Sequence, residues 1–368
     1  MQSSQPTYTL VAAEELRRFG ADCYLAAGLS EADARTAASL LVRTELRGVE
    51  THGVLWFPHY CHALRAGTIN PTPSIHCTQD LGAMLLVEGD GGLGHLVSSW
   101  AMSRCMERAA VHGVGVAAVR GSRHNGAASL YALQAQEAGF IGLSLTNGGV
   151  RVAPAGGREA LLGTNPIAFA APTASGAPFV MDMATSVVAG AKMRVFALKG
   201  QSIPAGWALD EEGRITTDPE AGDRGALLPL GSTLEMSSYK GFALGLVVET
   251  LCSALVGLNT GPEKARGVPN PGGGGAGHFL MAINIESLGD PAEFRERMAR
   301  TLTLLRESAP MEGVERIYTP GELEWLRETS KEREGAPVLT ATLNALRDLA
   351  VELGVREPTP LPKASAPR

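Results

Sequence analysis

Apolar residues recur at every third or fourth position near both ends of the chain, which is the spacing of an amphipathic helix. Ser30, Glu31 and Asp33 form a start signal for one such helix, because serine can accept a backbone hydrogen bond there and acidic residues suit the first turn. Gly28 and Gly48 lie where two of the patterns end. We therefore predict helices over residues 9–28, 30–46, 56–64, 290–307 and 335–354.

Between these ends, strand patterns alternate with helical ones. The segment 70–73, Asn-Pro-Thr-Pro, marks the change because its prolines interrupt regular structure. Such alternation is typical of an α/β arrangement. We predict strands over 83–88, 113–119, 140–146, 179–186 and 280–285, and helices over 97–110, over 127–138, from about 187, and from Lys240 through the apolar stretch 241–258. Residues 356–368 are rich in proline and are expected to lack order.

Composition limits the classes of function that are open to the chain. Hydrophobic residues are 45% and charged residues 19% of 368 residues, so a sizeable core is expected. The net charge of -6 argues against a nucleic-acid or anionic-membrane partner. Five cysteines without CxxC spacing favour an intracellular protein over a disulfide framework or a zinc site. The N-terminus lacks a signal-peptide pattern, and Glu249 within 241–258 favours a buried helix over a membrane span, so we expect a soluble cytoplasmic protein.

The turn after the second predicted helix combines residues suited to proton transfer. His52 can give or take a proton near neutral pH, and Thr51 can orient its ring. Gly53 allows the backbone to bend where a side chain would block it. A plain helix end followed by a turn explains the same residues equally well, so other segments must decide.

Familiar nucleotide-binding fingerprints are missing from the sequence. Gly113-Val114-Gly115 lies inside a predicted strand rather than after it, and the glycine run 271–277 lacks the Lys-Ser/Thr of a phosphate loop. Three other segments could present groups to a ligand: the loop 120–126, the turn 162–166 and the end of the strand 179–186. At the last of these, a helix start could hold a phosphate or ribose, although an ordinary Asp/Ser cap is the simpler alternative.

A catalytic metal is not expected. His59 and His62 have the spacing of a helical ligand pair, but no third ligand of matching placement is evident.

Taken together, the segments resemble the type-2 malate/lactate dehydrogenase family, whose members do not use the Rossmann fold. The family includes sulfolactate and ureidoglycolate dehydrogenases and reductases of cyclic imino acids. The resemblance covers about residues 9–355, with specific motifs in matching order. These are Thr51-His52-Gly53, Ser122-Arg123-His124, Leu162-Gly163-Thr164-Asn165-Pro166, Asp182-Met183-Ala184-Thr185-Ser186, Ile203-Pro204-Ala205-Gly206-Trp207, Lys240-Gly241 and Pro320-Gly321-Glu322.

The resemblance implies an α/β fold with a mixed-sheet cofactor domain and a helical domain built from both chain ends. The corresponding segments are 1–73, 74–314 and 315–355, followed by the tail 356–368. It also implies a homodimer, a small-molecule substrate, and NADPH or NADH as cofactor. By position, the implied catalytic residues are His52, Thr51 and His124, and the implied substrate contacts are Trp56, Thr164, Gly190 and Lys192. The implied cofactor contacts are Ser122, His124, Asn125, Asp182, Met183, Ala184 and Lys240.

Two departures from the family pattern bear on the substrate. Trp56 stands where the family usually has an arginine that grips the substrate carboxylate, and a bidentate arginine pair is far stronger than one indole donor. Gly190 and Lys192 stand where cyclic-imine reductases carry histidine and aspartate, so Lys192 resembles the hydroxy-acid branch and Gly190 leaves extra room.

We therefore predict an NAD(P)H-dependent reductase of a C=N or C=O bond in a small cyclic imine or 2-oxo/2-imino acid. His52 would be the proton donor, and Trp56 would stack on a substrate that is bulkier or less anionic at that end than malate. If Trp56 only packs internally, Arg47 or His59 could hold the carboxylate instead. A malate/lactate-type hydroxy-acid dehydrogenase and an inactive cofactor-binding homologue are the alternatives.

Overall fold

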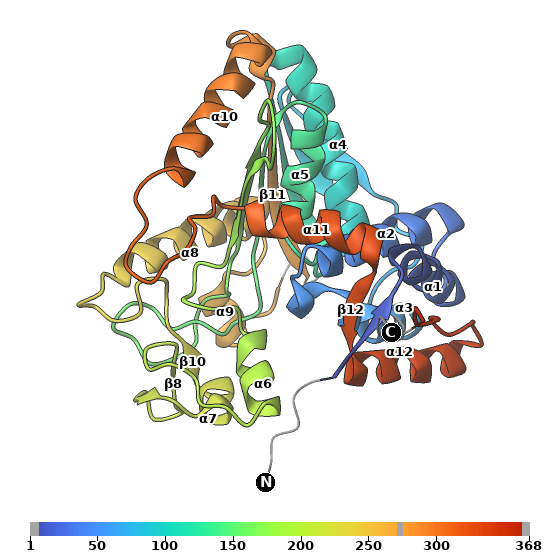
Figure 1. The fold of residues 1–368 in the computed structure, drawn as a ribbon, viewed down its shortest axis with the longest axis vertical. Coiled ribbons are helices and arrows are strands. Elements are labelled where there is room, and N and C mark those ends of the chain that lie inside the picture. Colours follow the sequence, from blue (N-terminus) through green and yellow to red (C-terminus); the bar gives the residue numbers. More distant parts are fainter. Residues whose placement is uncertain (1–6, 271–274, 363–368) are drawn as a thin grey trace, which may run out of the picture. The chain divides into compact units, whose positions relative to one another are not determined.

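The structure, a computed structural model, describes residues 7–270 and 275–362 (Figure 1). Residues 271–274 of the glycine run therefore lie outside the described residues. Contacts divide the chain into a central unit, residues 74–301, and a terminal unit formed by 2–73 and 302–368. The predicted mixed sheet is confirmed for the first unit, and the helical domain from both chain ends is confirmed for the second.

The terminal unit joins the two ends of the chain through a small antiparallel sheet. Tyr8 pairs with Leu339, and Val11 pairs with Ala336. The prediction of helix at 9–11 and 335–339 was wrong, because these strands depend on pairing with a distant partner that no local pattern reveals. The elements of this unit are β1 (Tyr8–Val11), α1 (Ala13–Ala26), α2 (Glu31–Leu46), α3 (Phe57–Arg65), α11 (Glu322–Glu334), β12 (Ala336–Leu339) and α12 (Thr340–Leu353), with the short 3₁₀ turns Glu50–His52 and Val54–Trp56.

The segment 356–362, expected to lack order, has defined contacts with the start of the terminal unit. Leu361 N donates to Leu10 O at 2.8 Å, and Thr359 N donates to a Glu15 carboxylate oxygen at 3.0 Å. The expectation is therefore corrected over these residues. Backbone groups next to an open strand edge supply hydrogen bonds that proline-rich composition alone does not predict.

The central unit is built on a seven-stranded sheet with the order β2-β3-β4-β11-β5-β6-β7. Only β3 and β4 pair in parallel, and the other neighbours are antiparallel. The strands are β2 (His76–Asp80), β3 (Met84–Glu88), β4 (Val114–Ser122), β5 (Ile141–Thr146), β6 (Ile167–Ala171), β7 (Phe179–Met183) and β11 (Ala276–Ile283).

Helices cover both faces of this sheet (Figure 1). Ala168 of β6 packs with Ala132 of α5, whereas the neighbouring Ile167 packs with Val248 of α8. Successive strand residues point to opposite faces, so α5 and α8 lie on opposite sides. The helices of the unit are α4 (Gly94–His112), α5 (Ser129–Glu137), α6 (Ala191–Leu198), α7 (Pro219–Arg224), α8 (Tyr239–Cys252), α9 (Gly261–Ala265) and α10 (Pro291–Arg306), which runs across the boundary at residue 301.

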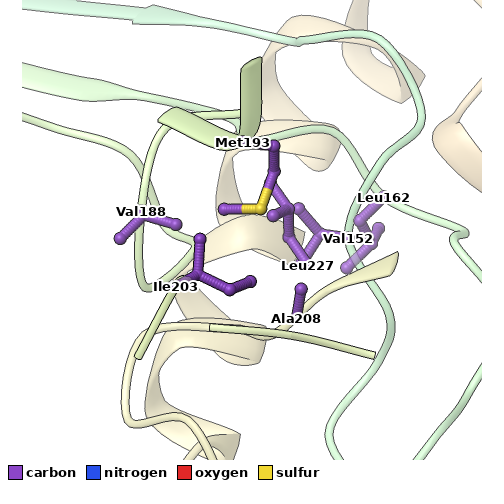
Figure 2. Close-up of a cluster of buried hydrophobic side chains, with 7 residues drawn as sticks. All are labelled: Val152, Leu162, Val188, Met193, Ile203, Ala208 and Leu227. Atoms are coloured by element: carbon purple, nitrogen blue, oxygen red, sulfur yellow. The ribbon is translucent and has the colours of Figure 1, made fainter. Parts of the chain in front are cut away.

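A small lobe extends from the end of β7 and carries α6 and α7. Its sheet has the order β10-β8-β9, with strands β8 (Ala208–Leu209), β9 (Ile215–Thr216) and β10 (Ala226–Leu227). Figure 2 shows the core of this lobe, where Met193 of α6 meets Val188, Ile203 and Leu227. All four side chains are buried, so α6 is fixed to the lobe through Met193.

Helix α8 differs from the buried helix expected for the stretch 241–258. The span Tyr239–Val256 has a mean hydropathy of 1.4, and 39% of it is buried, so by length and composition alone it could cross a membrane. Glu249 within it is buried and bonded to Asn165 and to Gly261 N. Leu246 and Val247 are 42% and 48% exposed, respectively. The helix therefore presents a large apolar surface outward.

Candidate functional site

The turn between α2 and α3 in the terminal unit places Thr51 against His52. The Thr51 hydroxyl lies 3.0 Å from His52 Nδ1, and both side chains are half-buried. A hydroxyl at Nδ1 can fix the orientation of the ring. The predicted hydroxyl partner is therefore within hydrogen-bonding distance of the candidate proton donor.

Trp56 is held by the same turn. Its indole N–H donates to the Thr51 carbonyl at 2.8 Å, and its ring stacks on Tyr60 with centroids 5.6 Å apart. The indole has one hydrogen-bond donor, and this donor is used within the turn. Trp56 can therefore offer a ligand its half-buried ring, but its N–H is already engaged.

A buried carboxyl that sequence reasoning missed supports the turn from below. Glu45 Oε2 accepts from Val54 N at 3.1 Å, and Glu45 is 4% exposed. A Cβ at position 53 would lie 2.1 Å from that oxygen, so only glycine fits there. Burial, assisted by the charge of Glu50, raises the pKa of Glu45 to about 7. The signal in the sequence was an acidic residue on the inner side of α2, eight positions before Gly53.

The alternative ligands named for a substrate carboxylate in this unit differ in availability. Arg47 is 3% exposed, and its Nη1 lies 2.8 Å from a Glu328 oxygen. His59 is exposed and packs edge-on to Trp56. His62 pairs with Glu352 at 2.8 Å. In the described ranges, no three His, Cys, Asp or Glu side chains gather in a way that could hold a metal ion.

In the central unit, the loop after β4 is attached to a buried histidine on β11. His278 Nε2 lies 2.8 Å from Ser122 Oγ, and its Nδ1 lies 2.7 Å from Thr146 Oγ1 and 3.3 Å from Asn125 Nδ2. Because an amide nitrogen only donates, Nδ1 is an acceptor and Nε2 carries the proton. Ser122 and Asn125 are buried with it, whereas His124 between them is exposed.

The environment of His278 keeps its imidazole neutral. Complete burial, and secondarily the charge of His124, lower the pKa of His278 to about 3. A neutral ring can accept at Nδ1 and donate at Nε2. These two hydrogen bonds link β11 to Thr146 of β5 and to Ser122 at the end of β4. Sequence reasoning passed over His278 because it lies within an apolar strand.

Backbone hydrogen bonds bring the turn 162–166 to the end of β7. Thr185 N and Oγ1 both donate to the Thr164 carbonyl, at 2.9 and 3.1 Å. Asp182 is exposed, and its carboxylate accepts from Ser129 N at 2.9 Å. The prediction of a helix from about 187 was wrong: α6 begins at Ala191, since Ser186 instead forms a bridge with Pro229. The segment 182–186 is therefore a strand end and not a helix start.

The remaining predicted residues lie on the lobe and on α8. Gly190 precedes α6, and a Cβ there would lie 3.3 Å from Nε of Arg151. Lys192 Nζ lies 5.4 Å from the centre of the Trp207 ring. Lys240 is exposed in the first turn of α8. Thr164, Gly190 and Arg151 belong to one connected region, since Arg151 N donates to Leu162 O at 2.7 Å.

The groups of the central unit match the chemistry of a nicotinamide dinucleotide. Asn125 Oδ1, an acceptor, and Arg123 Nε, a donor, are buried without a hydrogen-bond partner among the described residues. Such a cofactor carries a carboxamide, ribose hydroxyls and phosphates, which suit an amide, an exposed carboxylate such as Asp182 and a cation, respectively. These residues therefore fit the cofactor.

Comparison with known proteins gives consistent matches along the chain. A family model described as Malate/L-lactate dehydrogenase matches residues 11–347. The malate dehydrogenase of Pyrococcus abyssi is 39% identical, covering 95% of this chain and 96% of that protein. The NAD(+)-dependent ureidoglycolate dehydrogenase of Escherichia coli is 30% identical, covering 85% of this chain and 88% of that protein.

Solved structures agree with these matches. The malate dehydrogenase of Pyrococcus horikoshii superposes with a TM-score of 0.87 at 36% identity, covering 95% of this chain and 97% of that one. The delta1-piperideine-2-carboxylate reductase of Pseudomonas syringae superposes with a TM-score of 0.80 at 30% identity, covering 93% of this chain and 99% of that one. Dehydrogenases of hydroxy acids and a reductase of a cyclic imine thus share this fold.

Proposed function

The chain belongs to the malate/L-lactate dehydrogenase family, and from this premise we propose that it reduces a C=N or C=O bond of a small cyclic imine or 2-oxo/2-imino acid. The chain is an NAD(P)-dependent oxidoreductase, as the family and its named members are. The nicotinamide cofactor supplies the hydride when it is bound. The substrate heteroatom then requires a proton, which the protein must provide.

His52 is the proposed proton donor. An imidazole can release a proton at neutral pH, and the Thr51 hydroxyl at 3.0 Å from Nδ1 can orient the ring for that transfer. Glu45 and Gly53 hold the turn that carries this ring. On the central unit, Ser122, His124, Asn125, Asp182, Met183, Ala184 and Lys240 would hold the cofactor. We include His124 as a second candidate for acid/base work, since it is exposed beside Asn125.

The substrate class is inferred from the hydrogen bond that the Trp56 indole makes within its own turn. Because this N–H donates to the Thr51 carbonyl, position 56 offers a ligand an aromatic face but no hydrogen-bond donor for an anion. An apolar ring of a substrate suits such a face, whereas the compact, doubly charged oxaloacetate does not. Thr164, Gly190 and Lys192 remain the proposed contacts on the central unit.

The experiment compares NADH and NADPH oxidation with piperideine-2-carboxylate, pyruvate and oxaloacetate. We expect the highest kcat/KM with the cyclic imine, and we expect the Trp56→Arg variant to raise kcat/KM for oxaloacetate by about tenfold or more, as a bidentate carboxylate pair would. Efficient turnover of oxaloacetate by the unaltered chain would instead identify a hydroxy-acid dehydrogenase. Cofactor binding without turnover of any substrate would identify an inactive homologue.

The assembly proposed is a cytoplasmic homodimer that uses α8. Tyr239, Leu246, Val247 and Leu255 are between 42% and 56% exposed, an apolar surface that a second copy of the chain can cover. Sedimentation should give twice the monomer mass, and Leu246→Glu with Val247→Glu should reduce it to the monomer. A monomeric unaltered chain would refute this part of the proposal.

A further inference from the structure

We propose that Arg151 binds the substrate carboxylate, a function for which Trp56 offers no free donor because its indole N–H is bonded to the Thr51 carbonyl. The inference rests on the proposed function and specifies its substrate class: a carbonyl or imine compound that carries a carboxylate. Arg151 was not among the residues indicated by the sequence.

The backbone of Arg151 is fixed on both sides. Its N–H donates to Leu162 O at 2.7 Å, and its carbonyl accepts from Leu227 N at 2.8 Å. Leu162 begins the turn that carries Thr164, and Thr164 in turn is bonded to Thr185 after β7. Arg151 is thereby held beside two segments that are proposed to contact substrate and cofactor.

Its side chain occupies the space that Gly190 leaves. A Cβ at position 190 would lie 3.3 Å from Arg151 Nε and 3.4 Å from its Cδ, which is closer than most real contacts of a Cβ. A larger residue at 190 would therefore displace the guanidinium. The glycine that departs from the cyclic-imine reductase pattern makes room for an arginine at the same place.

Asp223 orients the guanidinium without using all of its donors. Arg151 Nη2 is bonded to the Asp223 carboxylate and to its backbone carbonyl at 3.3 Å. A guanidinium has five N–H groups, and the hydrogen bonds given by the described residues use those on Nη2, which leaves the N–H groups of Nη1 and Nε for a single-point contact with an anion. The Arg151 side chain is 34% exposed, so a small anion can reach the remaining edge. An arginine held by one carboxylate can thus bind a second one.

The neighbouring cations are less suitable for this task. Lys192 Nζ lies 5.4 Å from the centre of the Trp207 ring, so its charge is engaged by that ring. Arg194 is 75% exposed, with its Nε 4.0 Å from Asp223. A solvated, loosely held side chain gives little orientation. Arg194 therefore provides a matched control, since it contacts the same aspartate.

The test measures kcat/KM of Arg151→Gln and Arg194→Gln with two imines, piperideine-2-carboxylate and 1-piperideine, which lacks the carboxylate. We expect Arg151→Gln to lower kcat/KM for the carboxylate about 10- to 100-fold, chiefly through KM, as loss of a charge-assisted hydrogen bond would. For the imine that lacks the carboxylate, kcat/KM should change less than about twofold, and so should the KM for cofactor. Arg194→Gln should leave all values within about twofold.

A second variant guards against a folding defect. Gly190→Ala keeps Arg151 but displaces it, and should also raise KM for the carboxylate selectively. The inference is overturned if Arg151→Gln lowers kcat/KM equally for both imines, or leaves both unchanged, or if Arg194→Gln has the same effect. Failure of the proposed function is distinguishable, because the unaltered chain would then turn over none of the substrates, or oxaloacetate in preference to piperideine-2-carboxylate.

Discussion

Acidification should destabilise the central unit through His278. The folded unit holds this imidazole neutral with a pKa of about 3, whereas an unfolded chain protonates histidine near pH 6.5. Stability from this residue is therefore fully present above pH 6.5 and is lost as the pH falls toward 3. The difference corresponds to about 5 kcal/mol in total, and to about 2 kcal/mol by pH 5. Few single groups would contribute as much.

Replacement of the ring separates this effect from that of other groups. His278→Gln keeps a polar side chain for Ser122 or Thr146 but cannot take up a proton. Between pH 7 and pH 5 the unaltered chain should lose about 2 kcal/mol more unfolding free energy than the variant. Hydrogen exchange of peptides from β4, β5 and β11 measures this in the central unit itself. His112→Gln, at an exposed histidine of α4, is the control. It should lose as much unfolding free energy between pH 7 and pH 5 as the unaltered chain does. Equal losses in the unaltered chain and His278→Gln would refute the reasoning.

Three further predictions concern the terminal unit. In the folded chain the pKa of Glu45 is raised to about 7, so its contribution to the unfolding free energy is present below about pH 4.5 and is lost as the pH rises through 7. Between pH 4.5 and 8 this loss is roughly 3 kcal/mol, and hydrogen exchange in α2 should detect it. Glu45→Gln should abolish the loss. Gly53→Ala places a Cβ 2.1 Å from the Glu45 carboxyl and should cost about 1–3 kcal/mol in thermal unfolding, and an unchanged midpoint would contradict that contact. His52→Gln should lower kcat about 10²- to 10⁴-fold while NAD(P)H binding, followed by fluorescence, is unchanged; full activity would exclude His52 as proton donor.

Elements with their own local pattern were predicted well. Helix α2 begins after Ser30, whose hydroxyl accepts from Asp33 N at 3.2 Å, and ends at Leu46 as expected. The strands β3, β4 and β5 also lie where the apolar runs placed them. In each case the information needed, a cap or a short apolar run, is local to the element.

Elements that depend on distant partners were missed. Helix α11 is polar, and among its residues only Glu322 is buried, so it has no apolar stripe to detect. It is tied instead by ion pairs such as Arg17 with Glu332 and Arg43 with Glu328, both at 2.7 Å. Strand β6 follows Pro166 and is only five residues long, three of them alanines with little strand preference, so it also lacked a strong signal.

Residues of the candidate site were also predicted or missed according to whether their signal is local. Motif residues such as His52, Thr51 and Thr164 were identified because they lie in recognisable turns. Glu45, Arg151 and His278 were not, since each matters only through a partner brought close by folding: Gly53, Gly190 and Ser122, respectively. Residues of this kind can be identified only from the folded structure.

The pairing of β1 with β12 also affects the order in which a newly synthesised chain can fold. Thr340 Oγ1 donates to the Thr7 carbonyl at 2.8 Å across 333 positions of chain. At about 5–20 residues per second, a ribosome takes roughly 17–67 s to travel that distance. During this interval the first strand has emerged without its neighbour, while the whole of the intervening sheet can already close. Nascent chains of this protein should thus fold from the central unit outward, with the turn that carries His52 among the last parts to form.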